Sequence, residues 1–298
     1  MSMGKVIVGI GEILWDRFPD HKTLGGAPTN FAYHASALGN TGIVVSRLGT
    51  DELGREARSL IRSLKMDGRN LQDDSEHATG TVEVALDKNG IPDYTIKENV
   101  AWDFIEWTEE LSELANNTNA VCYGTLAQRS SVSRTTIQEF LKTVSNDTLR
   151  VFDINLRQHF YSREIIENSL GFADVLKLND DEIDTVSELL GLKESLTPEN
   201  KCRLILETFG LNLVCATLGS VGSILVSKEK TVRSRGYSVK VEDTVGAGDA
   251  FTAALIHHLL KGTPLKETNE RCNRYAAWVA SKRGGTPETD RGVIKTVK

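Results

Sequence analysis

Short apolar runs alternate with longer stretches of helical period along most of this chain, which limits the folds that it can adopt. Such alternation is typical of βαβ units, which build a mostly parallel sheet with helices on both faces. No Pro/Gly/Ser-rich linker or repeat interrupts it. We therefore predict a three-layer α/β/α fold with a doubly wound sheet, as a single domain over residues 1–298. Strands are expected at 6–10, 43–48, 120–124, 150–153, 175–177 and 213–217, and helices at 108–115, 132–144, 165–170, 182–190, 199–209 and 267–282.

One segment departs from this rhythm. Residues 79–97 alternate between polar and apolar side chains, as at Val82 and Val84, and contain the hairpin turn signal Asn89-Gly90. A two-stranded hairpin is rarely stable alone. We therefore expect it to cover another part of the molecule, although a plain surface hairpin has the same pattern.

Charge and composition exclude several partners. The net charge of −6 argues against nucleic acid or an anionic membrane as the main partner, while an anion of the size of ATP can still be bound by local dipoles. The chain has no run of about 18 apolar residues and no apolar signal core at its start. We expect a cytoplasmic protein with reduced thiols, because Cys122, Cys202, Cys215 and Cys272 are widely spaced and form no C-x-x-C pair.

Residues 243–249 read Asp-Thr-Val-Gly-Ala-Gly-Asp and precede an apolar helical run at 250–260. Glycines two apart can turn their N–H groups inward, and a helix N-terminus adds its positive dipole, so this turn predicts an anion site. Asp249 is explained either as a helix cap or as a proton acceptor whose pKa the helix N-terminus lowers. An anion site beside a proton acceptor suits phosphoryl transfer to a hydroxyl.

This stretch resembles the C-terminal signature of the PfkB, or ribokinase-like, carbohydrate kinases. The resemblance implies a ribokinase-like fold, ATP as phosphoryl donor, and Asp249 as the catalytic base. It also implies an anion hole formed by the backbone amides of Gly246, Ala247 and Gly248.

A second stretch resembles the family's N-terminal signature. Gly25-Gly26-Ala27-Pro28-Thr29-Asn30 looks like a helix start, with Pro28 in the first turn. The resemblance implies that Gly25, Gly26 and Asn30 contact the acceptor sugar, together with Asp16, which from its position alone is equally well a solvated turn residue. Ribokinases usually carry Lys where Ala27 stands and fructokinases usually carry Ala-Pro, which points away from ribose. The resemblance also makes residues 12–24 and 79–100 a small β-sheet lid that meets its copy in a homodimer.

Three further motifs follow predicted strands. Asp153-x-Asn155-x-Arg157 resembles a motif shared by fructokinases, 2-keto-3-deoxygluconate kinases and aminoimidazole riboside kinase, and implies that Arg157 contacts the substrate. Asn179 and Glu182 look like a helix cap, but they also match an N-x-x-E motif whose Glu orders the water shell of Mg²⁺. The turn from 217 to 222 implies nucleotide contacts.

The remaining implied site residues come from the C-terminal half. For the nucleotide they are Asn179, Thr217, Gly219, Gly222 and Asn273, the last beside the adenine. For a monovalent cation, K⁺, they are Asp243, Val245, Ala280, Arg283, Gly285 and Thr289.

The sequence thus predicts an ATP-dependent sugar kinase that phosphorylates the 6-hydroxyl of D-fructose. A 2-keto-3-deoxygluconate kinase, or another sugar or nucleoside kinase of the family, is the nearest alternative. A catalytically silent sugar-binding regulator would have lost the base or the anion hole, and both are present. Gly9-Ile10-Gly11 lacks the third glycine of a dinucleotide fingerprint, and G-x-x-x-x-G-K-[ST] does not occur, which disfavours a dehydrogenase and excludes a Walker-type NTPase.

Overall fold

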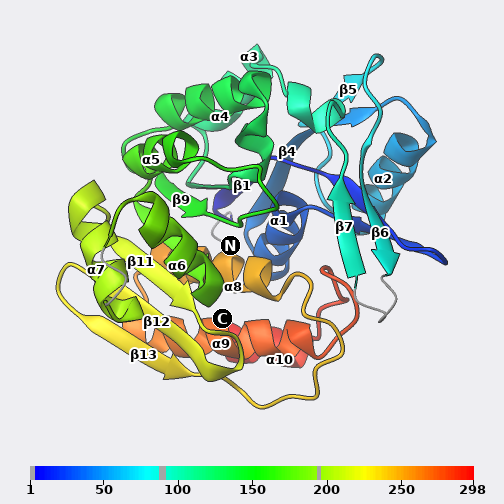
Figure 1. Ribbon diagram of the computed structural model, residues 1–298. Coiled ribbons are helices and arrows are strands. Elements are labelled where there is room, and N and C mark those ends of the chain that lie inside the picture. The colour runs from blue at the N-terminus through cyan, green and yellow to red at the C-terminus, as the bar shows by residue number, and fades with distance from the viewer. Residues whose placement is uncertain (1–3, 87–91, 193–195) are drawn as a thin grey trace.

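A large, mostly parallel sheet organises the protein. The structure is a computed structural model that describes residues 4–86, 92–192 and 196–298. Its strands, in sheet order, are β13, β12, β11, β10, β9, β8, β1, β4 and β5 (Figure 1). In this order, every neighbouring pair from β11 to β5 is parallel, whereas β12 is antiparallel to both of its neighbours, β11 and β13. Their bounds are β1 Val6–Ile10, β4 Thr41–Gly49, β5 Leu71–Asp74, β8 Ala120–Tyr123, β9 Leu149–Asp153, β10 Val175–Asn179, β11 Leu213–Thr217, β12 Gly222–Ser227 and β13 Thr231–Arg235.

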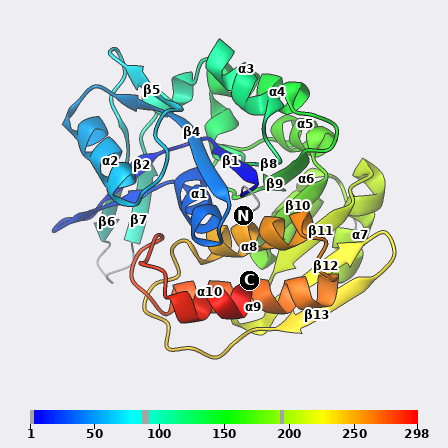
Figure 2. The ribbon, with the colours of Figure 1, turned by 180° about the vertical axis from the view of Figure 1, so that it is seen from behind.

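Helices cover both faces of this sheet, and successive strand residues point to opposite faces. Val8 and Ile10 of β1 pack into one apolar cluster, while Ile7, directly before Val8, packs into the other. The predicted three-layer α/β/α fold is therefore confirmed. One face carries α3 Glu109–Asn116, α4 Ser131–Thr143, α5 Arg163–Phe172, α6 Asp180–Leu189 and α7 Pro198–Phe209; the other, seen in Figure 2, carries α1 Ala27–Ala37, α8 Ala247–Leu260, α9 Leu265–Ala280 and α10 Arg291–Val297.

Three strands were missing from the sequence-based prediction: β5, β12 and β13. The outermost pair, β5 and β13, read Leu-Gln-Asp-Asp and Thr-Val-Arg-Ser-Arg. An edge strand has one exposed side and carries polar residues there, so it lacks the apolar run that marks an interior strand.

A second, smaller sheet has the order β3, β2, β6, β7. It combines β2 Leu14–Arg17 and β3 Lys22–Gly25 with β6 Gly80–Leu86 and β7 Pro92–Ile96, and β2 pairs with β6 in parallel. The two segments predicted as a lid thus form one sheet, although Gly25 at the end of β3 and Gly80 at the start of β6 are 55 positions apart. Figure 1 shows it beside the main sheet, near α2 Glu52–Ser63. The predicted Asn89-Gly90 turn lies outside the described residues.

The chain order of the strands reverses beside β1. From β1 the chain proceeds to β4 and β5 on one side, and then to β8 and onward to β11 on the other. Ligands of open α/β sheets bind outside the carboxyl ends of the strands at such a reversal. The topology therefore points to the residues that follow β1 and β8.

The four cysteines, Cys122, Cys202, Cys215 and Cys272, are buried free thiols, as predicted. No helix in the described part of the chain has the length and apolar character that a membrane crossing requires.

Asp51 joins the small sheet to the main body. As the N-cap of α2, its Oδ1 accepts a hydrogen bond from the Gly54 N–H at 2.8 Å. The same carboxylate accepts bonds from the Thr79 hydroxyl at 2.6 Å and the Thr79 N–H at 2.9 Å, directly before β6 begins. One side chain thus caps a helix and holds the start of a strand.

We predict that Asp51→Ala lowers the free energy of unfolding by about 1–3 kcal/mol, because it removes a cap and leaves two donors of Thr79 without their acceptor. Urea unfolding would measure the change. Thr108→Ala is the matched control, since Thr108 caps α3 through a single bond to Leu111. An equal loss in both variants would show that the bonds to Thr79 contribute nothing.

Candidate active site

A pocket opens at the carboxyl ends of the central strands, where the strand order reverses. Three carboxylates line it: Glu12 follows β1, Asp153 ends β9, and Asp249 lies in the first turn of α8. The pocket therefore collects residues from distant parts of the chain on one edge of the sheet. Its other lining residues are Ala27, Pro28, Phe31, Cys122, Tyr123, Gly124, Leu126 and Asn155.

The start of α8 has the geometry of an anion site. Gly246 is the N-cap with φ of 76°, a left-handed conformation that glycine adopts without strain, and a Cβ there would lie 2.5 Å from Gly285 Cα. The N–H groups of Gly248 and Asp249 lie in the first turn, where no helical carbonyl precedes them. These donors and the helix dipole can hold an anion beside the pocket.

Asp249 is in direct contact with Asn30 of α1. The Asn30 Nδ2 donates to Asp249 Oδ2 at 2.9 Å. A residue predicted to bind the sugar and the predicted base therefore touch, although they are 219 positions apart.

The predicted direction of the Asp249 pKa is wrong. Its pKa is raised to about 6, first because burial withdraws water from the carboxylate and then because Asp153 is close by. The hydrogen bond from Asn30 opposes this rise. Desolvation therefore outweighs the helix dipole, although Asp249 as a whole residue is only half-buried.

A buried ion pair, unnoticed in the sequence, lies behind Asp249. Lys177 Nζ donates to Asp153 Oδ1 at 3.0 Å, and the Thr252 hydroxyl donates to Asp153 Oδ2 at 2.7 Å. A Cβ on Gly248 would lie 3.3 Å from Lys177 Nζ, so the second glycine of the signature leaves room for this ammonium group. A lysine inside the apolar strand Val-Leu-Lys-Leu was the available signal, since charged side chains are rarely buried without a partner.

Burial is the largest single effect and would lower the pKa of Lys177, but the carboxylates of Asp153, Glu182 and Asp249 together outweigh it and raise that pKa. The lysine is therefore a permanent cation beside the first turn of α8.

Glu12 is the second residue that sequence reasoning missed. It is 5% exposed, and burial raises its pKa to about 7, against the opposing charge of Arg157. Its place directly after Gly11, at the carboxyl end of a buried strand, was the signal.

The predicted sugar residues on the small-sheet side also lie together. A Cβ on Gly25 would lie 2.6 Å from Asp16 Oδ2, and Gly26 is the N-cap of α1 with φ of 112°. Burial raises the pKa of Asp16 to about 6, and Arg157 opposes the rise. Arg157 itself is exposed and donates to the carbonyl of its neighbour Leu156.

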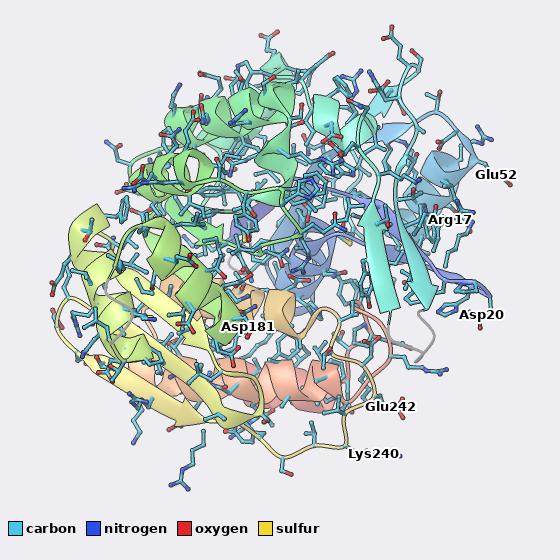
Figure 3. The ribbon with its side chains drawn as sticks, viewed as in Figure 1. Arg17, Asp20, Glu52, Asp181, Lys240 and Glu242 are labelled. Atoms are coloured by element: carbon cyan, nitrogen blue, oxygen red, sulfur yellow. The ribbon has the colours of Figure 1, made fainter. Side chains whose placement is uncertain are left out.

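Asn179 and Glu182 form a capping box at the start of α6. The Asn179 side chain accepts from the Glu182 N–H, and Glu182 accepts from the N–H groups of Asn179 and Leu156, each at 2.8 Å. A second cavity beside them is lined by Arg157, Asn179, Asp181 and Glu182. Figure 3 shows Asp181 at the inner end of α6, whereas Lys240 and Glu242 lie on the outer loop that leads to α8.

The turn after β11 is built by its glycines. Gly219 has φ of 54° and starts a short 3-10 helix, Gly219–Val221. Gly222 has φ of 119°, and a Cβ there would lie 2.0 Å from the Ser234 carbonyl, so the pairing of β12 with β13 requires this glycine. Thr217 ends β11 and donates to the Leu178 carbonyl at 3.4 Å.

Asn273 is engaged inside the protein. It is 7% exposed, and its Nδ2 donates to Ser223 Oγ at 2.6 Å and to the Asn269 carbonyl at 2.8 Å. The structure thus gives it a packing role between α9 and β12, and a contact with adenine stays a prediction.

Several oxygen atoms of the residues predicted to bind K⁺ accept hydrogen bonds within the protein. The Ala280 carbonyl accepts from the N–H groups of Glu242 and Asp243, and the Gly285 carbonyl accepts from His34. Asp243 accepts from the N–H groups of Val245 and Gly284 at 3.0 Å each. Arg283 and Thr289 lie, like Gly285, in the segment between α9 and α10, and a K⁺ site formed by these residues stays a prediction.

Comparison with known proteins shows the family and agrees with the fold. The family model described as "pfkB family carbohydrate kinase" matches residues 19–291. An uncharacterised sugar kinase from Pyrococcus horikoshii is 29% identical over 96% of this chain and 94% of its own length. Its crystal structure superposes with a TM-score of 0.80, covering 95% of this chain and 94% of that one, and it has also been solved with ATP.

Two further relatives carry more specific names. Fructokinase-1 of Zea mays is 26% identical over 100% of this chain and 99% of its own. An ATP-dependent 6-phosphofructokinase of Thermoanaerobacterium thermosaccharolyticum is 29% identical over 84% of this chain and 76% of its own.

The raised pKa of Asp249 leads to a stability prediction. The folded state holds this proton more tightly than the unfolded chain does, so the contribution of Asp249 to stability is most favourable at low pH and is lost as pH rises from 3.8 through about 6. We predict that Asp249→Asn, which removes the buried charge, raises the melting temperature at pH 8 relative to the original protein. The advantage should shrink towards pH 4. Melting curves across this range test it, and a lower melting temperature of the variant at pH 8 would contradict it.

Proposed function

Because the chain belongs to the pfkB family of carbohydrate kinases, we propose that it transfers the γ-phosphoryl group of ATP to the 6-hydroxyl of D-fructose. The observation that carries this proposal is the Asp249 carboxylate, which lies in a pocket beside the N–H groups of Gly248 and Asp249 in the first turn of α8. A proton acceptor and an anion site are thereby within reach of one bound hydroxyl.

In the proposed reaction, Asp249 takes the hydroxyl proton as the sugar oxygen attacks the γ-phosphorus. The new oxygen–phosphorus bond forms while the bond to ADP breaks, and the N–H groups of Gly246, Ala247 and Gly248 hold the charge on the phosphoryl oxygens. The Ala247 N–H donates to the Thr244 carbonyl at 3.3 Å in the free protein, so it has to leave this carbonyl to bind the phosphoryl group. Lys177, buried behind Gly248, adds a fixed positive charge on the same side. Asn30 holds Asp249 through its hydrogen bond.

Glu182 and Asn179 fit a magnesium ion through water. Each Glu182 oxygen already accepts one backbone N–H and keeps a second lone pair, which suits a bond from a water bound to the metal. Magnesium would neutralise the phosphate charge of the nucleotide. Arg157, on the wall of the same cavity, would contact the phosphates or the sugar.

Exposed apolar side chains support a nucleobase site nearby. Val221 follows β11, and Val239, Val241 and Val245 lie on the loop that leads to α8; these four side chains are between 38% and 70% exposed. An adenine covering part of this surface would remove it from water. Thr217, Gly219, Gly222 and Asn273 would border the nucleotide.

A neutral acceptor suits the charge of the pocket. Its eleven described lining residues include three carboxylates and no cationic side chain, and Asp16 adds another carboxylate on the small-sheet side. Two cations act on these four carboxylates from outside the lining, Lys177 on Asp153 and Arg157 on Glu12, Asp16 and Asp249, so the formal charge stays negative. Carboxylates bind sugar hydroxyls well, whereas they repel an acceptor that carries a carboxylate or a phosphate. This favours fructose over 2-keto-3-deoxygluconate and fructose 6-phosphate.

The other parts of the proposal concern the small sheet. Asp16, Gly25 and Gly26 would hold the sugar hydroxyls, and the sheet of β2, β3, β6 and β7 would close over them as a lid. Contact between two such sheets in a homodimer, and activation by K⁺, stay predictions.

We predict that fructose has the highest kcat/KM on a panel with ribose, adenosine, 2-keto-3-deoxygluconate and fructose 6-phosphate, because the pocket is lined by carboxylates. A coupled assay of ADP release would measure this. A higher kcat/KM for 2-keto-3-deoxygluconate or fructose 6-phosphate would contradict the charge argument. A higher kcat/KM for ribose would contradict fructose as the acceptor but would leave the charge argument intact.

We predict that Asp249→Asn lowers kcat by about 10²- to 10⁴-fold, the usual range for loss of a general base, with ATP binding almost unchanged. Because the base must be ionised, kcat of the original protein should fall as pH drops below about 6. Steady-state kinetics from pH 5 to 8 would measure both effects. If kcat of the variant stays within about threefold of the original value, Asp249 is not the base.

A further inference from the structure

His34 is fully buried on α1, one helical turn after Asn30, and the reaction proposed above does not use it. Residues four apart share a face of a helix, so both side chains point towards α8 and the loop after α9. The His34 ring bridges two groups: its Nε2 lies 2.9 Å from the Gly285 carbonyl oxygen, and its Nδ1 lies 2.9 Å from the Tyr275 hydroxyl.

These partners decide the tautomer of His34. The Gly285 carbonyl can only accept, so Nε2 carries the proton and donates. Burial lowers the pKa of His34 to about 4, so the ring is neutral at physiological pH, and its bare Nδ1 accepts from the Tyr275 hydroxyl. The Tyr275 hydroxyl thus fixes the His34 ring through Nδ1, while the ring binds the Gly285 carbonyl through Nε2.

Gly285 lies between two parts of the candidate active site. A Cβ on Gly285 would lie 2.7–2.8 Å from the amide atoms of Asn30. On its other side, a Cβ on Gly246 would lie 2.5 Å from Gly285 Cα. The Gly285 backbone therefore packs directly against the residue that bonds Asp249 and against the N-cap of the helix that carries Asp249.

The loop around Gly285 is attached on both sides. Besides His34, the Tyr33 hydroxyl of α1 donates to the Pro287 carbonyl at 2.7 Å. From the α8 side, Asp243 accepts the Gly284 N–H at 3.0 Å. The loop that follows α9 is thus hydrogen-bonded both to α1 and to the segment before α8, and its position sets how these two helices meet.

We propose that His34 is a positioning residue: by holding the Gly285 carbonyl, it seats this loop between Asn30 and Gly246, so that Asn30 reaches Asp249 and orients it towards the acceptor hydroxyl. This inference rests on the proposed function, because it assigns a consequence for catalysis to the orientation of Asp249. It adds a residue from outside the pocket to those on which turnover depends.

The test compares two buried histidines. His34→Leu removes the bond to Gly285 with little change in volume, and it should lower kcat by about 10- to 100-fold, as a misplaced catalytic group does. His258→Leu is the matched control, because His258 is also fully buried and bonds a carbonyl, that of Val297, at the far end of α8. It should lose stability while keeping kcat within about twofold. His34→Gln, whose Nε2 can reach the same carbonyl, should restore most of the rate.

A double-mutant cycle with Asp249→Asn separates positioning from general damage. If His34 acts through Asp249, His34→Leu should cost less than about threefold once the base is gone. An equal factor in both backgrounds, or equal rate losses for His34→Leu and His258→Leu, would overturn the proposal. Should Asp249→Asn alone keep full activity, the proposed base itself is wrong, and this outcome differs from failure of the positioning role.

Gly285→Ala keeps the test decisive if His34→Leu does not fold. Its new Cβ meets only the Asn30 side chain among its nearest neighbours, and Gly285 has no positive φ that alanine would strain. The variant should displace Asn30 and reproduce the loss of kcat, with the same weakening in the Asp249→Asn background. A wild-type kcat for Gly285→Ala would overturn the proposal.

Discussion

The contact between Asn30 and Asp249 is the interaction on which the site depends, because it joins the first helix of the chain to the helix that begins 220 residues later. It can form only when α1 and α8 lie next to each other on one face of the sheet. Their apolar sides meet in a single cluster that includes Phe31, Ala35, Ala250 and Ala254. Small residues in this cluster let the two helices approach closely, so core packing directly sets the distance between two functional side chains.

Burial of charge is the second constraint. The edge of the sheet holds the carboxylates of Glu12, Asp153 and Asp249 with little water, and such groups are costly unless they are paired or hydrogen-bonded. Lys177 and Thr252 satisfy Asp153, while Asn30 satisfies Asp249 in part. The remaining cost appears as raised pKa values for Glu12 and Asp249. A carboxylate with a pKa near 6 is a stronger base than an exposed one and is still ionised at neutral pH.

Glycines connect these constraints. Gly246, Gly248 and Gly285 each lie where a Cβ would meet a neighbour that the site requires: Gly285 itself, Lys177 and Asn30, respectively. The signature around Asp249 is therefore needed as much for close approach of other residues as for a turn that exposes N–H groups. This explains why a change at any of the three would disturb more than the local backbone.

Much of the fold was readable from local pattern. Buried parallel strands are continuous apolar runs, so the interior strands β1, β4 and β8 to β11 could be placed within a few residues. The polar edge strands β5 and β13, and the antiparallel strand β12 between β11 and β13, could not. The signatures likewise identified Asp249, Asn30 and Asp16, because glycine turns and carboxylates at strand ends have local sequence patterns.

Lys177, Glu12 and His34 could not be assigned in this way. Each is a single polar residue in or beside an apolar stretch, and its partners lie far away in the sequence: Asp153 is 24 positions from Lys177, and Gly285 is 251 from His34. The sign of the Asp249 pKa shift depended on the same long-range packing. The sequence determines a helix start with its dipole, but desolvation arises only when α1, β9 and β10 close around the carboxylate, and in this protein desolvation is the larger effect.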